Sequence, residues 1–189
     1  LKMTRDALRA LIFKLRGGLW TALYLLILLL ASPEKSRLVS SLLLVALGQL
    51  IRFWASGCIV KYRGEKVGAE QLVTWGPYAF VRNPLYVGNG LIGLGWALLA
   101  GPLVVALFLT SFFLIYGVWI VPYEESFLEK KFGEAYSVYR QSTGRFIPSF
   151  WPGDRLHGPY NWSIVWRSER HSLWVTLAGT ALLLSRFKW

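Results

Sequence analysis

Apolar residues gather in long blocks along this chain, separated by short polar or basic stretches. The blocks are Leu19–Ala31, Leu38–Val60, Tyr86–Leu99, Leu103–Val121 and Leu173–Ser185. As a helix rising about 1.5 Å per residue, the second block is long enough to cross an apolar bilayer core of roughly 30 Å. The pattern therefore predicts an all-α, polytopic helical membrane protein with about 4–5 transmembrane helices.

The third and fourth blocks meet at a Gly-Pro pair at 101–102. Because Gly-Pro breaks helices and both flanks are apolar, we expect a tight helical hairpin. Gly93, Ala97 and Gly101 recur every four residues and form a small-residue face that lets helices approach closely. The last block, Leu173–Ser185, is too short to span comfortably, so we expect it to be tilted, interfacial or half-inserted.

Composition and charge narrow the class of protein further. The chain has 189 residues, is 54% hydrophobic and carries 10 Trp, which is too apolar for an ordinary soluble domain. A net charge of +11 is a feature of nucleic-acid-binding proteins, but here the basic residues flank apolar blocks, so no nucleic-acid partner is expected. Cys58 is the single cysteine, and the two histidines lack metal-binding spacing, so no metal site is expected.

The distribution of basic residues predicts the topology. They crowd the N-terminal arm, the Lys61–Arg82 connection and the Lys130–Arg170 region, whereas the hairpin tip has none. By the positive-inside rule, we expect these three parts on the cytoplasmic side. The segment Leu72–Gly90 and the pair Glu124-Glu125 then share one membrane face. The prediction is an integral, multi-pass membrane protein with a cytoplasmic cofactor pocket.

The chain is interpreted as one domain over 1–189. Its expected parts are a basic amphipathic arm (1–18), N-terminal transmembrane helices (19–70), a catalytic core (71–148), and a C-terminal tail with a short apolar helix (149–189). The arm either lies on an anionic membrane face or is a plain solvated helix start. The Trp- and Arg-rich stretch Trp151–Arg170 either borders a substrate entrance or docks on lipid headgroups.

An amphipathic helix is expected over Glu124–Arg140. Its apolar stripe consists of Leu128, Phe132, Tyr136 and Tyr139. The stripe either docks on the membrane surface or closes a pocket as a lid.

Polar residues near the membrane edge suggest a site for a charged small molecule. Arg82 can pair with a carboxylate, and Glu124 or Glu125 with an ammonium or with ribose hydroxyls. The alternative for the two acids is a solvated helix start, where the helix dipole favours them. Tyr78 and Tyr86 can stack on an adenine or serve the interfacial aromatic belt.

Two segments in this region carry a resemblance. GPYAFVRNPLYVGNG (Gly76–Gly90) and EESFLEKKFGEAYSVY (Glu124–Tyr139) resemble the isoprenylcysteine carboxyl methyltransferase and phospholipid N-methyltransferase superfamily. Its members are small integral membrane enzymes that use S-adenosylmethionine. The likeness covers about Gln71 to Pro148.

The resemblance implies S-adenosylmethionine as the cofactor and Arg82, Asn83 and Glu124 as the catalytic candidates. Gly88-Asn89-Gly90 corresponds to a GxG element, although helix packing explains these glycines equally well. The implied cofactor-binding residues are Gln71, Leu72, Val73, Tyr78, Asn83, Pro84, Leu85, Tyr86, Gly88, Asn89, Gly90, Glu124 and Glu125.

Two departures from the family pattern concern the substrate. The usual RHP is RNP here, so Asn83 replaces a possible proton acceptor. Ile120 stands where the carboxyl methyltransferases carry a substrate-binding arginine. Arg52 or Arg145 can substitute for that arginine, and the alternative for Arg52 is snorkelling to the interface.

The expected function is methyl transfer to a lipophilic acceptor at the cytoplasmic membrane face, similar to isoprenylcysteine carboxyl methyltransferase. Membrane lipids and the acceptor are the expected partners. Phospholipid-amine N-methylation and small-thiol methylation are alternatives. So are an NADPH-dependent sterol-reductase-like enzyme and a non-catalytic membrane scaffold.

Overall fold

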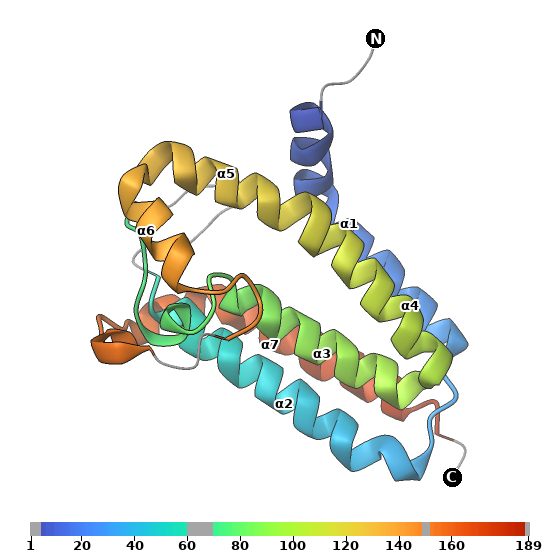
Figure 1. Ribbon diagram of the computed structural model, residues 1–189. Helices are drawn as coiled ribbons and strands as arrows, with labels where there is room; N and C mark the ends of the chain where they lie inside the picture. The colour runs from blue at the N-terminus through green and yellow to red at the C-terminus, as the bar shows by residue number, and fades with distance from the viewer. Residues whose placement is uncertain (1–4, 60–69, 149–151, 188–189) are drawn as a thin grey trace.

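A computed structural model of the protein describes residues 5–59, 70–148 and 152–187 (Figure 1). Strand-type pairing in these residues is limited to a single bridge between Val81 and Gly144. The all-α fold expected from the sequence is therefore confirmed. The α-helices are α1 (Arg5–Leu30), α2 (Lys35–Gly57), α3 (Pro84–Ala100), α4 (Pro102–Phe112), α5 (Val121–Phe132), α6 (Glu134–Ser142) and α7 (Trp162–Leu184). Short 3-10 turns lie at Gly76–Ala79 and Gly153–Leu156, and a π-helical segment, Phe113–Ile120 (η2), joins α4 to α5.

Parts of four sequence predictions lie outside the described residues. These are the first four residues of the basic arm, residue 60 at the end of the second apolar block, residues 61–69 of the basic connection, and residues 149–151 and 188–189 of the C-terminal tail. The orientation of the bundle across the membrane stays a prediction.

Length and composition of the helices fit a membrane protein. Three helical stretches are long and apolar enough to cross a membrane, namely Leu8–Leu30, Lys35–Gly57 and Pro102–Phe132, and α3 is a shorter apolar helix. Large apolar side chains such as Leu29 and Val39 are exposed on the outside of the bundle. Lipid chains can cover these side chains, because the helices satisfy their own backbone hydrogen bonds.

The predicted helical hairpin is confirmed as α3 and α4. Gly101 makes the turn with a φ of 137°, a conformation that residues with a Cβ rarely adopt, and Pro102 starts α4. Across the hairpin, Gly93 faces the ring of Phe108: a Cβ built on Gly93 would lie 2.3 Å from a ring carbon. The small residue therefore lets the two helices approach closely.

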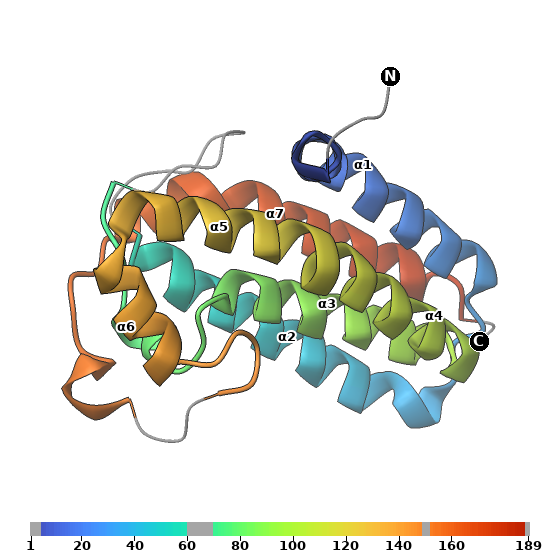
Figure 2. The ribbon, with the colours of Figure 1, turned by 45° about the horizontal axis from the view of Figure 1, so that its top comes forward.

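Helices α2 and α3 lie side by side in both views (Figures 1 and 2). Their backbones meet at glycines: a Cβ on Gly48 would lie 2.6 Å from the carbonyl oxygen of Gly88, and one on Gly95 would lie 2.7 Å from that of Ser41. Without an aqueous hydrophobic effect between membrane helices, this close backbone packing is a main source of their association.

Three predicted helical segments differ in extent from the structure. The described part of the basic arm, from Arg5 onward, and the first apolar block form one continuous helix, α1. The expected helix over Glu124–Arg140 is divided at Gly133, which has a φ of 54° and separates α5 from α6. A glycine in this conformation ends a helix, because the left-handed region costs it no Cβ clash.

Helix α7 starts well before the last apolar block. It begins at Trp162, after Asn161, whose side-chain oxygen accepts hydrogen bonds from the backbone N–H groups of Ser163 and Ile164. Hydropathy alone misses this first half because it contains several charged residues. One of them, Glu169, is buried against α2 rather than exposed to solvent.

The glycine contacts between α2 and α3 predict a stability effect. Gly95→Ala is expected to lower the free energy of unfolding by about 1–3 kcal/mol through overpacking, measured by denaturant titration in detergent. The matched control is Gly18→Ala, because nothing lies within 4 Å of a Cβ built at Gly18. The control should be neutral or slightly stabilising, since Ala favours helix by about 1 kcal/mol over Gly. Equal effects of the two substitutions would contradict the proposed packing.

Candidate functional site

A cavity of about 500 Å³ lies between α2, α3 and α5–α6, with α1 and α7 completing its wall. This volume is within the range of small-molecule sites, roughly 300–1,000 Å³. Both sequence motifs contribute to it. The predicted cofactor-binding residues that line the cavity are Gln71, Leu72, Val73, Tyr78, Asn83, Pro84, Leu85, Tyr86, Asn89 and Glu124. Arg82 and Arg52 line it as well.

Several lining residues come from elements that the sequence analysis did not assign to the site. They lie on α1, on η2 and on the first half of α7, and include Arg16, Trp20, Tyr116, Ser168, Glu169 and His171. Arg16 adds a cation, which is held over the Phe13 ring at 3.9 Å and donates to the Phe13 carbonyl at 2.7 Å. The cavity therefore joins segments from nearly the whole length of the chain.

Four predicted site residues are not among the lining residues: Gly88, Gly90, Glu125 and Arg145. The two glycines lie at helix contacts. A Cβ on Gly88 would lie 2.6 Å from Cγ of Arg52, and one on Gly90 would lie 2.9 Å from the ring of Phe112. Gly88 thus leaves room for the Arg52 side chain to reach the cavity, and the role of both glycines toward a cofactor stays a prediction.

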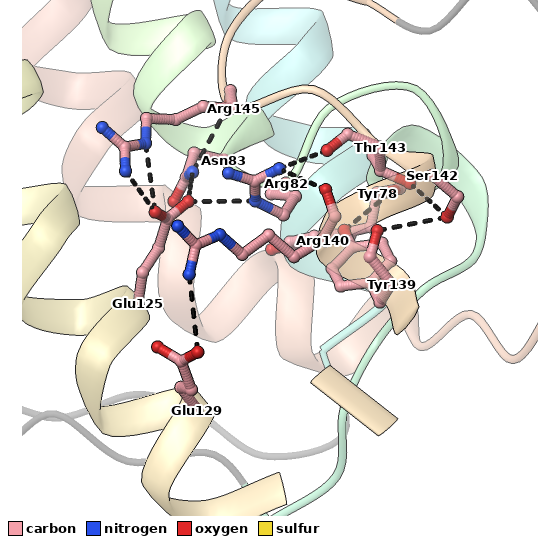
Figure 3. Close-up of polar contacts among 10 residues, drawn as sticks. All are labelled: Tyr78, Arg82, Asn83, Glu125, Glu129, Tyr139, Arg140, Ser142, Thr143 and Arg145. Atoms are coloured by element: carbon pink, nitrogen blue, oxygen red, sulfur yellow. Dashed lines mark hydrogen bonds and ion pairs between the residues drawn. The ribbon is translucent and has the colours of Figure 1, made fainter. Parts of the chain in front are cut away.

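Glu125 is buried and holds two arginines (Figure 3). Its Oε1 accepts from Arg82 Nε at 3.0 Å, and its Oε2 accepts from Arg145 Nε at 3.0 Å and Nη2 at 2.6 Å. Asn83 Nδ2 donates to the same Oε1 at 3.4 Å. Charge-assisted contacts of this kind are among the strongest polar contacts in proteins.

The two adjacent glutamates therefore have different surroundings. Successive helix residues are turned by about 100°, so their side chains point in different directions. Glu125 points toward Arg82 and Arg145, whereas Glu124 lines the cavity with the Tyr86 hydroxyl as a hydrogen-bonding neighbour.

Arg82 connects the first motif to the last turn of α6 and to the residues that follow it. Its Nη1 donates to the carbonyl of Arg140 at 3.1 Å and to that of Thr143 (Figure 3). Its backbone N–H donates to the Gly144 carbonyl at 2.8 Å. The guanidinium thus holds a loop and a carboxylate in place at the border of the cavity.

Two tyrosines of α6 cover one side of the cavity. Tyr136 and Tyr139 line it, and the Tyr139 hydroxyl donates to the Tyr78 carbonyl at 2.7 Å. Burial raises the pKa of Tyr136 to about 12 and that of Tyr139 further above its ordinary value. Both hydroxyls therefore stay neutral at physiological pH.

A second polar cluster lies between α2, α3 and α7. Arg52 donates through Nε and Nη2 to the two oxygens of Glu169, at 2.9 and 3.0 Å, and through Nη1 to Asn89 Oδ1. Gln49 Nε2 donates to Glu169 at 3.5 Å and its Oε1 accepts from Thr176 at 3.0 Å. Arg52 is thus ion-paired inside the bundle.

A sequence signal for this pair exists. Glu169 is the sole acid of α7, and Arg52 interrupts an otherwise apolar stretch of α2. Since an unpaired charge is costly within a membrane, Arg52 in apolar α2 needs a partner of opposite sign. Glu169 is the one acid that α7 offers, although Arg167 and Arg170 flank it in the sequence.

An apolar helical bundle enclosing a polar and aromatic cavity is typical of a membrane enzyme with a small-molecule site. Residues 36–135, more than half of the chain, match the model of the phospholipid methyltransferase family. The chain belongs to this family, which confirms the resemblance found in the sequence and supports the class of membrane methyltransferase.

Two curated proteins are similar to this chain. They are the cobalt-zinc-cadmium resistance protein CzcN of Cupriavidus metallidurans, 36% identical over 106 residues, and the nickel-cobalt-cadmium resistance protein NccN of Alcaligenes xylosoxydans xylosoxydans, 33% identical over 106 residues. Each match covers 55% of this chain but only 45% or 46% of the relative, so the chain spans less than half the length of these relatives. No solved structure matches the chain.

The buried position of Glu125 predicts a large loss of stability on substitution. Glu125→Gln leaves Arg82 buried without its counter-charge and should destabilise the protein by about 3–5 kcal/mol. Glu129→Gln is the matched control, because its ion pair with Arg140 is about half exposed and such pairs contribute under about 1 kcal/mol. Denaturant titration of both variants in detergent tests this, and similar stabilities would contradict it.

Cys58 packs against Val73 and Tyr78 in the wall that carries the first motif. Burial raises the pKa of its thiol to about 11, so at pH 8 on the order of one thiol in a thousand is ionised. We expect iodoacetamide to label the native protein far more slowly than the SDS-unfolded protein, with mass spectrometry as the readout. Equal labelling rates would show that this wall is open.

Proposed function

We propose that this protein transfers a methyl group from S-adenosylmethionine to a lipophilic acceptor, in the manner of isoprenylcysteine carboxyl methyltransferases. The observation that carries this proposal is that segments of both motifs of a methyltransferase family line one cavity. The predicted site on the cytoplasmic membrane face is part of the same proposal.

The residues present suit this cofactor. S-adenosylmethionine, when bound, supplies a methyl group already activated by its sulfonium, so the protein need not create an electrophile. Glu124 offers a carboxylate for the ammonium or the ribose hydroxyls, and Arg16 offers a cation for the carboxylate. Tyr78 and Tyr86 offer aromatic faces for the adenine.

The chain's own part in the reaction is alignment and exclusion of water. Direct displacement needs the acceptor atom in line with the methyl–sulfur bond, and such alignment can supply a large part of the rate enhancement. Tyr136 and Tyr139 cover the cavity and exclude water. Asn83 and Glu124 line the cavity. Arg82 is a positioning residue that acts through Glu125 and through residues 140–144 at the end of α6.

The acceptor comes from the membrane in this proposal, since the cavity lies among helices that are apolar outside. A lipid carboxylate, an amine headgroup and an apolar thiol are the three acceptor chemistries that the proposal compares. The names of CzcN and NccN refer to metal resistance of those proteins and do not specify a reaction, so they do not help to choose the acceptor.

The test is calorimetric titration of S-adenosylmethionine into detergent-purified protein, with NADPH as comparison ligand. We expect binding of S-adenosylmethionine alone. Glu124→Gln should weaken it by about 1.5–3 kcal/mol, through loss of a charged hydrogen bond. Glu129→Gln, outside the cavity, should leave the affinity unchanged.

Three other outcomes of this titration would contradict part or all of the proposal. Binding of NADPH alone would place the protein with the sterol-reductase-like enzymes. If neither ligand binds to the folded protein, the result would favour a non-catalytic scaffold function. An unchanged affinity in Glu124→Gln would remove this carboxylate from the cofactor site.

A further inference from the structure

Part of the cavity wall is polar although it is built by helices apolar enough to cross a membrane. Arg52 lies in the candidate span Lys35–Gly57, and Tyr116 lies in the span Pro102–Phe132. Both line the cavity together with Asn89 and Glu169. Ionisable groups within membrane helices are expensive and are mostly retained for function.

Hydrogen-bond donors remain on Arg52 after its contacts are counted. A guanidinium has five N–H groups. Nε and Nη2 each donate one N–H to an oxygen of Glu169, and Nη1 donates one N–H to Asn89 Oδ1. One N–H on Nη1 and one on Nη2 have no acceptor among the described residues. Both Glu169 oxygens, in contrast, already accept from Arg52 or Gln49.

Tyr116 adds a third donor. Its hydroxyl accepts from Asn89 Nδ2 at 3.2 Å, and no residue in the described ranges accepts its proton. The side chain is only 2% exposed, with its ring between Trp20 at 4.9 Å and Tyr86 at 4.4 Å. It belongs to the π-helical segment, and π-helical turns occur frequently at functional sites.

We infer that Arg52 and Tyr116 form the subsite for the methyl acceptor and select an anionic, lone-pair-rich group, a carboxylate or thiolate, over an amine. The inference rests on the proposed methyltransferase function. The subsite presents N–H and O–H donors, and hydrogen bonds to the charged form of a carboxylate or thiolate favour that form. Glu169 and Asn89 are positioning residues, since they hold the guanidinium and the phenol.

A carboxylate is already an anion and needs no base. A thiol first releases its proton to water, and the donors of the subsite favour the resulting thiolate. The acceptor's lone pair forms the new bond to carbon while the methyl–sulfur bond breaks and its electron pair goes to sulfur. An anion and a sulfonium thereby become a neutral ester or thioether and a neutral sulfide group. A neutral amine would instead yield a cation, which three donors do not stabilise.

The structure also separates the two arginines that the sequence left as alternatives. Arg145 is bound to Glu125 and is not among the lining residues of the cavity. Arg52 lines the cavity and is held there by Glu169. Glu169 lies outside the family-matched residues 36–135, so this support comes from a part of the chain that the family match does not include.

The experiment measures transfer of the tritiated methyl group from S-adenosylmethionine by the purified 189-residue chain. The probes are N-acetyl-S-farnesylcysteine as the carboxylate, 1-decanethiol as the thiol, and phosphatidylethanolamine in mixed micelles as the amine. We expect the carboxylate or the thiol to be methylated, and the probe that reacts identifies the source of the anion. The amine should stay unlabelled.

Tyr116→Phe removes one oxygen and should lower kcat/KM for the reactive probe by at least tenfold, with the calorimetric Kd for S-adenosylmethionine within threefold of the original. Arg52→Lys should likewise lower kcat/KM at least tenfold and leave the Kd for S-adenosylmethionine within threefold of the original. Tyr24→Phe is the matched control, because the Tyr24 hydroxyl donates to the Gly179 carbonyl at 2.7 Å away from the cavity lining. Its kcat/KM should not change.

The inference is overturned if the amine alone is methylated, or if Tyr116→Phe and Arg52→Lys retain full kcat/KM. It is also overturned if the protein binds S-adenosylmethionine but methylates neither anionic probe. Absence of S-adenosylmethionine binding in the unmodified protein would instead refute the proposed function on which the inference rests.

Discussion

The cavity depends on the pairing of buried charges between segments that are far apart in the chain. Glu125 holds Arg82 of the first motif and Arg145 of the loop after α6, so the two motifs become walls of one space. Arg52 and Glu169 connect α2 to α7 in the same way. In an apolar bundle a single unpaired charge is strongly unfavourable, and so each pair fixes the relative position of its helices.

Much of the fold could be predicted because apolar blocks and Gly-Pro breaks act locally. The hairpin around Gly101 follows from two residues and their apolar flanks. The first half of α7 could not be found in this way, because its charged residues are typical of a solvent-exposed segment. Only the structure shows that Glu169 is buried in an ion pair with Arg52. The division at Gly133 depends on a local backbone conformation that an amphipathic stripe does not report.

The sequence predicts which residues belong to the site better than it predicts what each side chain contacts. Motif residues such as Tyr86 and Glu124 line the cavity, but the direction of each side chain depends on helix packing. This explains why Glu124 and Glu125, adjacent in sequence, have different partners. The same dependence applies to Gly88, which lies against the side chain of Arg52. This contact can be recognised only after α2 and α3 have been packed together.

The account's central claim is that the two motif segments bind one cofactor in one cavity. An experimental structure with bound S-adenosylhomocysteine, the stable product of methyl transfer, tests this most directly. The account predicts ligand density inside this cavity, in contact with Tyr86 and Glu124, with its sulfur on the side of Tyr116. Density at another place on the protein, with this cavity empty at saturating ligand, would contradict it.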